Sequence, residues 1–489
     1  MRYLKSFLKT EYHFLSNHEK IGAFIFYILA VSVFYSPVIF WGKSLQSAIY
    51  HPNTLIQEGG FGYQGRKPFS AFNVDISGAT FGEFPINKLV GDIYRSGQLP
   101  LWNPYKGLGE PIPEQLGSSV FFPYQILEDL SPVWAWDFFY LGRLIIAGFF
   151  SFLFLRSLKV SKIGSLFGGL VYMFSGTFTW FINNEQMTNP AMMLPVILWS
   201  LEGLLQSLRP RYVVFSAVSL ALILVSAPPG VTLYAFLLIF SFCFFRILSG
   251  SSLRGRSALL LLFVLITALG LTAPLSLSVF DFLKEALSLR EGSGLASVSP
   301  ISLAFVVFPG LSYFPVDYRF ISNGLWDDVG SYLGVLPIFL IIAGLVLIRR
   351  FGRERGPFLL FAGFGVFMLL KNYGFLFFPL LGKLPLFSVV WSPRWSGPAW
   401  TFAFTIAAAL SFEVIRKNQA DLSKKISGFV KKRPFKYWLV VSGLITLLAY
   451  FFKTTFDFVI GYGDKTFMIG SPPISSWVFH FIASVTILF

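Results

Sequence analysis

Carboxylates are the side chains of this sequence best suited to general base catalysis. The chain has only four histidines (His13, His18, His51 and His480), and their scatter disfavours a histidine triad or a histidine metal site. Asp75 and Glu83 lie in the apolar and aromatic run 72 to 85, and an acid in such a cleft tends toward a raised pKa, which suits a base. Both are candidate catalytic residues; the alternative is that Asp75 caps a helix and Glu83 is a solvated surface acid.

Three arginines are candidate ligands for a phosphate group. Arg290 and Arg394 flank apolar stretches, and a guanidinium can hold a phosphate with two hydrogen bonds. Their alternative role is to extend toward lipid headgroups. Arg143 lies about two turns inside an apolar stretch that also holds Asp137, and a charge at that depth marks a functional site by default. Its alternative is a buried ion pair with another helix.

Three further residues are candidate contacts for a sugar or an acceptor. Trp102 offers a stacking face and Asn103 an amide, although in a turn flanked by prolines such residues also pack and cap the turn. Glu185, with Asn183 and Asn184, forms a polar tip between two apolar stretches, where it either reaches a cavity or ends a helix.

The elements that position these residues must be transmembrane helices. Of 489 residues, 55% are apolar and 13% charged, and the mean hydropathy is +0.66. Apolar stretches near the roughly 20 residues needed to cross a bilayer recur along the chain. Hydrocarbon cannot satisfy backbone amides, so they should be helices. The expected spans are 21 to 41, 136 to 155, 163 to 182, 190 to 207, 212 to 227, 231 to 248, 257 to 280, 331 to 348, 357 to 373, 397 to 415, 437 to 453 and 475 to 489.

The basic residues follow membrane topology. Most of the 39 lysines and arginines fall in alternate connections, which the positive-inside rule places in the cytoplasm together with the N-terminus. The net charge of +15 therefore indicates orientation and does not require nucleic acid as a partner. A single cysteine, Cys243, excludes a disulfide framework and a CxxC metal site.

The three longest connections fall on the non-cytoplasmic side and indicate where chemistry takes place; of the inner connections only the lysine-rich segment 416 to 436 is long. We divide the chain into an N-terminus and first helix (1–41), a large outer loop with short helices and the candidate active site (42–135), helices 2 to 7 (136–280), an outer loop with an interfacial segment (281–330), and helices 8 to 12 (331–489). The last part includes an outer loop (371–396) and a basic inner loop (416–436). The short final span leads us to expect that the natural chain continues past Phe489 or ends in the interface.

The first outer loop carries the most unusual run of residues, Pro100-Leu101-Trp102-Asn103-Pro104-Tyr105. It resembles the first-loop signature of bacterial YfhO-type membrane proteins, which belong to the GT-C class of glycosyltransferases. The likeness continues, in order, through 120–123, 169–176, 194–195, 288–290, 332–334 and 384–394. The chain departs from the pattern at Ala227-Pro228-Pro229-Gly230, where such proteins often have Gly-His-Pro, and it stops where many continue.

The resemblance implies an all-α GT-C-like bundle of about 12 transmembrane helices in the inner membrane of a bacterium. It implies an enzyme that moves a sugar from a polyprenyl-phosphate donor to a cell-envelope glycan or polymer, with inversion, and it matches Asp75 to the family's first-loop acid. Membrane lipids are further partners; no cofactor is implied, and whether a divalent metal assists stays open. The alternatives are a transporter or flippase of lipid-linked sugars, and a non-catalytic envelope assembly protein.

Overall fold

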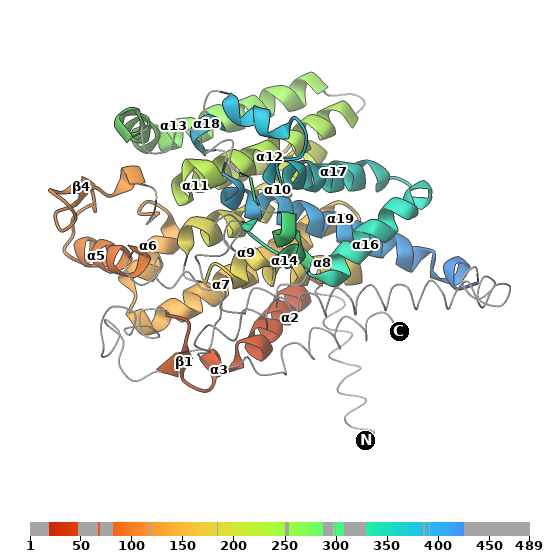
Figure 1. The fold of residues 1–489 in the computed structure, drawn as a ribbon, viewed down its shortest axis with the longest axis horizontal. Coiled ribbons are helices and arrows are strands. Elements are labelled where there is room, and N and C mark those ends of the chain that lie inside the picture. Colours follow the sequence, from red (N-terminus) through yellow and green to blue (C-terminus); the bar gives the residue numbers. More distant parts are fainter. Residues whose placement is uncertain are drawn as a thin grey trace.

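A computed structural model describes residues 19–46, 67–68, 82–115, 117, 119–182, 184–249, 254–286, 297–298, 300–307, 329–384, 387–390 and 392–424. Within these ranges the chain is mostly helical (Figure 1). The longer helices are α2 (Glu19–Phe34), α5 (Phe84–Arg95), α6 (Pro123–Leu130), α7 (Val133–Ser157), α8 (Lys162–Met173), α10 (Glu185–Ser207), α11 (Pro210–Ser226), α12 (Pro229–Ser249), α13 (Arg254–Ala286), α16 (Val335–Val346), α17 (Arg355–Asn372) and α19 (Gly397–Lys417).

Short elements connect these helices. Two pairs of two-residue strands occur in the described ranges: β1 (Lys43–Ser44) runs parallel to β2 (Lys67–Pro68), and β3 (Trp102–Asn103) runs antiparallel to β4 (Glu110–Pro111). The short helices are α3 (Ser36–Ile39), α9 (Gly176–Thr179), α14 (Leu303–Val307), α18 (Phe387–Val390), and the 3-10 turns η3 (Pro113–Gln115), η6 (Pro300–Ser302), η8 (Ile348–Arg350), η9 (Phe378–Lys383) and η10 (Pro393–Ser396).

Local sequence explains where several helices begin. Proline occupies the first turn of α5, α6, α11 and α19, where its missing N–H costs nothing. Side chains cap two others: the Ser161 hydroxyl accepts from the Gly164 N–H of α8, and the Asn184 amide oxygen accepts from the Met187 N–H of α10. The starts of α8, α11 and α19 lie within two residues of the predicted positions, whereas α10 begins five residues before its predicted start.

Four helical segments among the described residues are long and apolar enough to cross a membrane: Val133–Ser157, Pro229–Ser249, Gly255–Phe282 and Pro393–Lys417. They indicate a multi-pass membrane protein. The prediction of about twelve transmembrane helices is not reproduced. The described residues hold twelve helices of at least seven residues, but α5 and α6 lie within the predicted outer loop 42–135, and α8 and α16 have 12 residues each. The predicted spans 437 to 453 and 475 to 489 lie outside the described residues.

The broken spans have visible causes. The predicted span 163 to 182 is divided because the Ser175-Gly176 step ends α8, and the Gly176 N–H bonds instead to the Tyr332 carbonyl at 3.1 Å. The first span divides at Tyr35, just before the Ser36-Pro37 step that starts α3. Apolar composition alone does not reveal such interruptions, because it measures preference for lipid and not helix continuity.

The bundle core lies around α7, α10 and α19. Helix α7 packs against α8 and α10, and α19 packs against α8, α16 and α17. Small residues allow these helices to approach closely: Gly168 of α8 lies against Leu155 and Ala409, and Gly365 of α17 lies against the Phe404 ring. Close packing through small residues is how membrane helices associate where lipid offers no hydrophobic gain.

The two ends of the bundle differ in character. At one end, which we call the basic end, charged residues pair between helices: Arg156 with Glu19 (2.5 Å), Arg246 with Glu202 (2.8 Å) and Lys417 with Glu354 (2.7 Å). At the other, the loop end, residues 82–132 form what we call the loop segment. Figure 1 shows its orange elements α5, α6 and β4 gathered beside the start of α7.

The loop segment has a small core of its own. Val90 of α5 packs with Ile112 and Val120, and the Tyr94 hydroxyl donates to the Val120 carbonyl at 2.7 Å. Gly91 brings α5 directly onto the backbone of Asp129 in α6, where any side chain would collide. The segment is therefore an ordered unit, and α6 joins it to the bundle.

Candidate functional site

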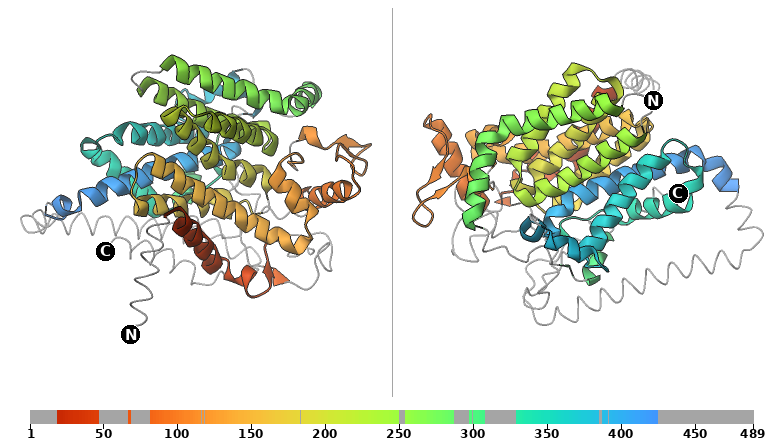
Figure 2. Two further views of the ribbon diagram at one scale, coloured as in Figure 1. Left: turned by 180° about the vertical axis from the view of Figure 1, so that it is seen from behind. Right: turned by 90° about the horizontal axis from the view of Figure 1, so that it is seen from above.

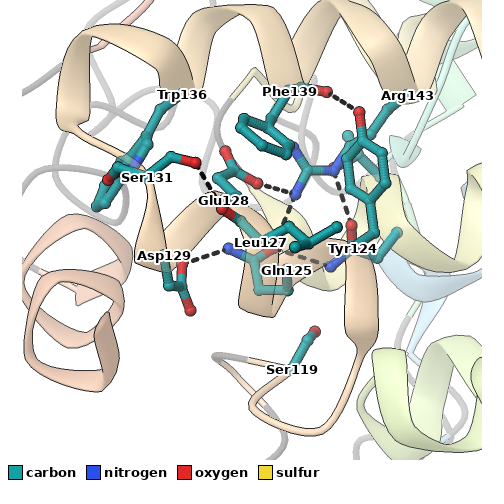
Figure 3. Close-up of polar contacts among 12 residues, drawn as sticks. Ser119, Tyr124, Gln125, Leu127, Glu128, Asp129, Ser131, Trp136, Phe139 and Arg143 are labelled. Atoms are coloured by element: carbon teal, nitrogen blue, oxygen red, sulfur yellow. Dashed lines mark hydrogen bonds and ion pairs between the residues drawn. The ribbon is translucent and has the colours of Figure 1, made fainter. Parts of the chain in front are cut away.

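A buried polar cluster, which we call the Arg143 cluster, lies where the loop segment meets the bundle (Figure 3). The Arg143 guanidinium, on α7, pairs with the Glu128 carboxylate of α6. Its Nη2 also donates to Gln125 Oε1 at 2.7 Å, and its Nε donates to Asn189 Oδ1 of α10, again at 2.7 Å. The pair is nearly inaccessible, with side-chain exposures of 1% and 3%. One cation thus connects three helices.

Further contacts fix the orientation of this guanidinium. The Tyr124 ring lies 5.2 Å from the guanidinium carbon, and the Tyr124 hydroxyl donates to the Phe139 carbonyl of α7 at 2.7 Å. Gln125 accepts from Asn189 Nδ2 at 3.1 Å and donates to Asp129 Oδ1 at 2.8 Å (Figure 3). Because the amide of Gln125 both accepts and donates, it links the arginine to a second carboxyl group.

Burial raises the pKa of the acids around the cluster. It raises the pKa of Glu128, while the adjacent Arg143 acts in the opposite direction. Burial raises the pKa of Asp129 well above its ordinary value, and the charge of Glu128 adds to the effect. For Glu185, burial and then the charge of Glu128 raise the pKa to about 7. The cluster and its neighbour Glu185 hold three carboxyl groups against one guanidinium, so burial and mutual repulsion both favour protonation of these acids.

Glu185, the first residue of α10, connects this cluster to the start of α5. It is 4% exposed, and Asn87 of α5 hydrogen-bonds to its side chain. The next residue, Gln186, donates from its side-chain nitrogen to Glu83 Oε1 at 2.6 Å. Glu83 is therefore a buried residue held on α10 and not a solvated surface acid. Its predicted catalytic role stays a prediction.

Several polar atoms in this region lack a hydrogen-bond partner among the described residues. They are Glu185 Oε2, Asp129 Oδ2 and Asn87 Oδ1, and all three atoms are buried. An unsatisfied carboxyl oxygen in such a place favours the protonated acid, which can then give up its proton to a reacting group.

Of the predicted phosphate-binding arginines, Arg143 lies at the centre of this site. It forms an ion pair with Glu128, and this matches the alternative role predicted for it, a buried ion pair with another helix. Arg394 lies in η10, half-buried, with its guanidinium carbon 5.5 Å from the Phe181 ring and 5.3 Å from the Trp395 ring. Arg290 and the proposed base Asp75 lie outside the described residues. The phosphate-binding role stays a prediction for each arginine.

Trp102 and Asn103 lie on β3, in the hairpin that projects from the loop segment. The Asn103 side chain accepts from the Tyr105 N–H at 3.0 Å, which caps the turn, and the Trp102 indole lies against Gly109. Within the described ranges, neither residue hydrogen-bonds to the Arg143 cluster. These contacts match the packing and capping alternative; a sugar contact by either residue stays a prediction.

Four members of the site were not predicted: Gln125, Glu128, Asp129 and Asn189. A signal for three of them exists in the sequence, because positions 125, 128 and 129 are spaced to share one face of a helix. That helix begins at Pro123 and has eight residues, and its polar side chains are fully buried. Short amphipathic helices usually turn such a face to water, so sequence alone assigns it to the surface.

Among the described residues, no group of three or more histidine, cysteine, aspartate or glutamate side chains is arranged to hold a metal ion. No family model matches this chain, and no curated protein matches it. Inference about function therefore depends on the residues and their geometry.

Proposed function

We propose that this protein is a membrane glycosyltransferase of the GT-C kind, which moves a sugar from a polyprenyl-phosphate donor to a cell-envelope acceptor. The observation that carries the proposal is the meeting of buried carboxyl groups from the loop segment and from α10 at one end of an apolar helix bundle. A lipid-linked donor must reach its enzyme from the bilayer, while its sugar must meet groups able to accept a proton. The loop end offers both.

In this proposal the acidic stretch 72 to 85 supplies the base. Glu83 is held against Gln186 at the start of α10, which tethers the stretch beside the Arg143 cluster. Asp75 lies eight residues earlier in the chain, and we assign it the role of base. Glu83 then acts as a positioning residue for the stretch that carries Asp75.

The reaction is a single displacement at the anomeric carbon. The acceptor oxygen attacks this carbon as Asp75 takes the hydroxyl proton, and the bond from the anomeric carbon to the phosphate oxygen breaks. The polyprenyl phosphate leaves with the electron pair, and a cation must balance its charge. Arg394 and Arg290 are the proposed cations, because a guanidinium matches the geometry of phosphate oxygens.

The test uses the full chain in nanodiscs with radiolabelled polyprenyl-phosphate hexoses and a bacterial envelope fraction as acceptor. We expect transfer of label by the wild type, no transfer by Asp75→Asn, and reduced transfer by Glu83→Gln. Glu110→Gln is the matched control, because Glu110 pairs only with the exposed Lys106 at 2.9 Å on the hairpin. It should transfer at the wild-type rate.

Two results would contradict the proposal. Undiminished transfer by a folded Asp75→Asn variant would remove this residue from the mechanism. A wild type that transfers no sugar but moves the lipid-linked sugar across a liposome bilayer would instead identify a flippase.

A further inference from the structure

The β3–β4 hairpin presents a cluster of exposed apolar side chains, which we call the apolar tip: Leu99, Leu101, Trp102, Tyr105 and Leu108. Tyr105 is 83% exposed and Leu108 fully exposed. The exposed face of the neighbouring α5 is different, because its Lys88, Asp92 and Arg95 pair with one another. Several large apolar side chains exposed on one short segment mark a contact with a membrane or a partner.

The hairpin is built to hold these residues outward. Gly109 has a φ of +99° and lies against the Trp102 indole, where a side chain would collide. One face of the indole is thereby fixed on the hairpin and the ring is half exposed. The charges beside the tip, Lys106 and Glu110, pair at 2.9 Å, so the tip carries little net charge. Such a surface enters a lipid interface at low electrostatic cost.

The position of the tip indicates which partner it meets. The tip is followed directly by η3, which packs on α13, and Ser278 of α13 donates a hydrogen bond to Glu114 of η3. The apolar part of α13 is Gly255–Phe282. Its 28 residues span roughly 42 Å, which matches the thickness of a bilayer with both of its headgroup layers. Ser278 lies four residues before the end of this segment, so it lies at the level of the headgroups.

The end of α13 continues the same apolar surface. Pro274 lies inside this helix. Figure 2 shows that the green ribbon of α13 bends toward its C-terminal end, beside the orange loop segment. Past the proline, Leu277 and Phe280 are exposed, and the Lys284 ammonium lies 4.6 Å from the Phe280 ring. Aromatic residues next to a lysine are typical of the membrane interface.

We propose that the apolar tip lies in the headgroup region of the membrane that α13 crosses. The tip and the end of α13 then form one lipid-contacting surface at the loop end. This inference does not depend on glycosyl transfer. It assigns to Trp102 and Tyr105 the interfacial position that amphipathic aromatic rings prefer.

The test measures the depth of a spin label at the tip. Cys243 is the only cysteine of the chain, so Leu108→Cys in a Cys243→Ser background takes a single nitroxide. The protein is placed in nanodiscs of phosphatidylcholine with a minority of phosphatidylglycerol. Collisions of the label with oxygen, which concentrates in lipid, and with a water-soluble nickel chelate are compared. Lys88→Cys on α5 is the aqueous reference, and Ile266→Cys on the exposed face of α13 is the lipid reference.

We expect the ratio of oxygen to nickel collisions at position 108 to be several-fold above that at position 88 and to lie between the two references. A ratio equal to that at position 88 would place the tip in water and overturn the proposal. Low collision with both reagents would also overturn it, because a protein surface, and not lipid, would then cover the tip.

Discussion

Arg143 of α7 and Glu128 of α6 form an ion pair that neither water nor lipid reaches, and α6 is the element through which the loop segment attaches to the bundle. The guanidinium also donates from Nη2 to Gln125 and from Nε to Asn189. Desolvating two charges is expensive, so such a pair persists only where its geometry satisfies both groups. Here it fixes the loop segment on two bundle helices at once.

Breaking this pair on one side should be costly. Arg143→Met leaves the Glu128 carboxyl buried among apolar groups, and we expect the free energy of unfolding to fall by about 3–5 kcal/mol. Denaturant unfolding in detergent micelles measures the loss. Glu128→Gln alone should cost less, because its amide can still accept from Arg143.

The double variant Arg143→Met with Glu128→Gln is the control. It carries neither charge, so it should regain a large part of the stability lost in Arg143→Met, and a double-mutant cycle gives the coupling energy of the pair. Strict additivity of the two single changes would show that the pair does not join the loop segment to the bundle.

Features that depend on neighbouring residues can be predicted from the sequence, whereas features that depend on contacts between distant residues cannot. The positions of α7, α10, α12, α13 and α19 follow from continuous apolar stretches, and the structure confirms the helical class and the apolar helices. Whether an apolar stretch forms one continuous helix depends on contacts between residues far apart in the chain. An example is the hydrogen bond from the Gly176 N–H to the Tyr332 carbonyl. For this reason, counting apolar residues could not predict the number of membrane-spanning helices.

In the site, too, some residues can be recognised from the sequence and others only from the fold. Arg143 and Glu185 are recognisable in the sequence because each is charged beside or within an apolar stretch. Their neighbours Glu128 and Asp129 are not recognisable, because they lie on a short helix that the sequence alone places at the surface. Only the packing of this helix against α7 shows that they are buried. Asn189 is one polar residue in an apolar helix, and only the crossing of α7 and α10 gives it a partner.

Glu185 should make stability depend on pH. Its pKa in the folded protein is about 7, above the ordinary value of 4.5, so folding favours the protonated acid. The stabilisation is complete below pH 4.5 and is lost as the pH rises toward 7. Glu185→Gln mimics the neutral acid, and we expect it to be the more stable protein above pH 7, by on the order of 3 kcal/mol. The free energy of unfolding of both proteins, measured from about pH 4 to about pH 8, gives the difference, because this range includes the pKa of the glutamate in the unfolded and in the folded state.

The control for that measurement is Glu110→Gln, which changes a carboxylate on the hairpin. Its unfolding should follow the wild-type pH dependence. Should Glu185→Gln also follow the wild type at every pH, the glutamate would ionise without cost, and the burial of its carboxyl group would have no energetic consequence.

Arg394 should affect donor binding more than the chemical step, if the proposed function holds. Its guanidinium lies near both the Phe181 and the Trp395 rings, which limit the directions in which it can point. Loss of a charged hydrogen bond to a phosphate costs about 2 kcal/mol, so Arg394→Gln should raise the KM for a polyprenyl-phosphate hexose at least about 10-fold. Arg394→Lys should recover part of this. An unchanged KM in a folded Arg394→Gln variant would assign this arginine to packing alone.

The distribution of charge between the two ends of the bundle predicts the orientation of the protein. Besides its three ion pairs, the basic end carries further basic residues at the connections α7–α8, α10–α11 and α16–α17, namely Lys159, Arg209, Arg211 and Arg349. Such residues stay on the cytoplasmic side. In the Cys243→Ser background, a membrane-impermeant maleimide should label Lys88→Cys of the loop segment in intact cells. Lys162→Cys, at the start of α8, should react only after the membrane is opened. The reverse pattern would put the loop end in the cytoplasm, where an envelope acceptor could not reach it.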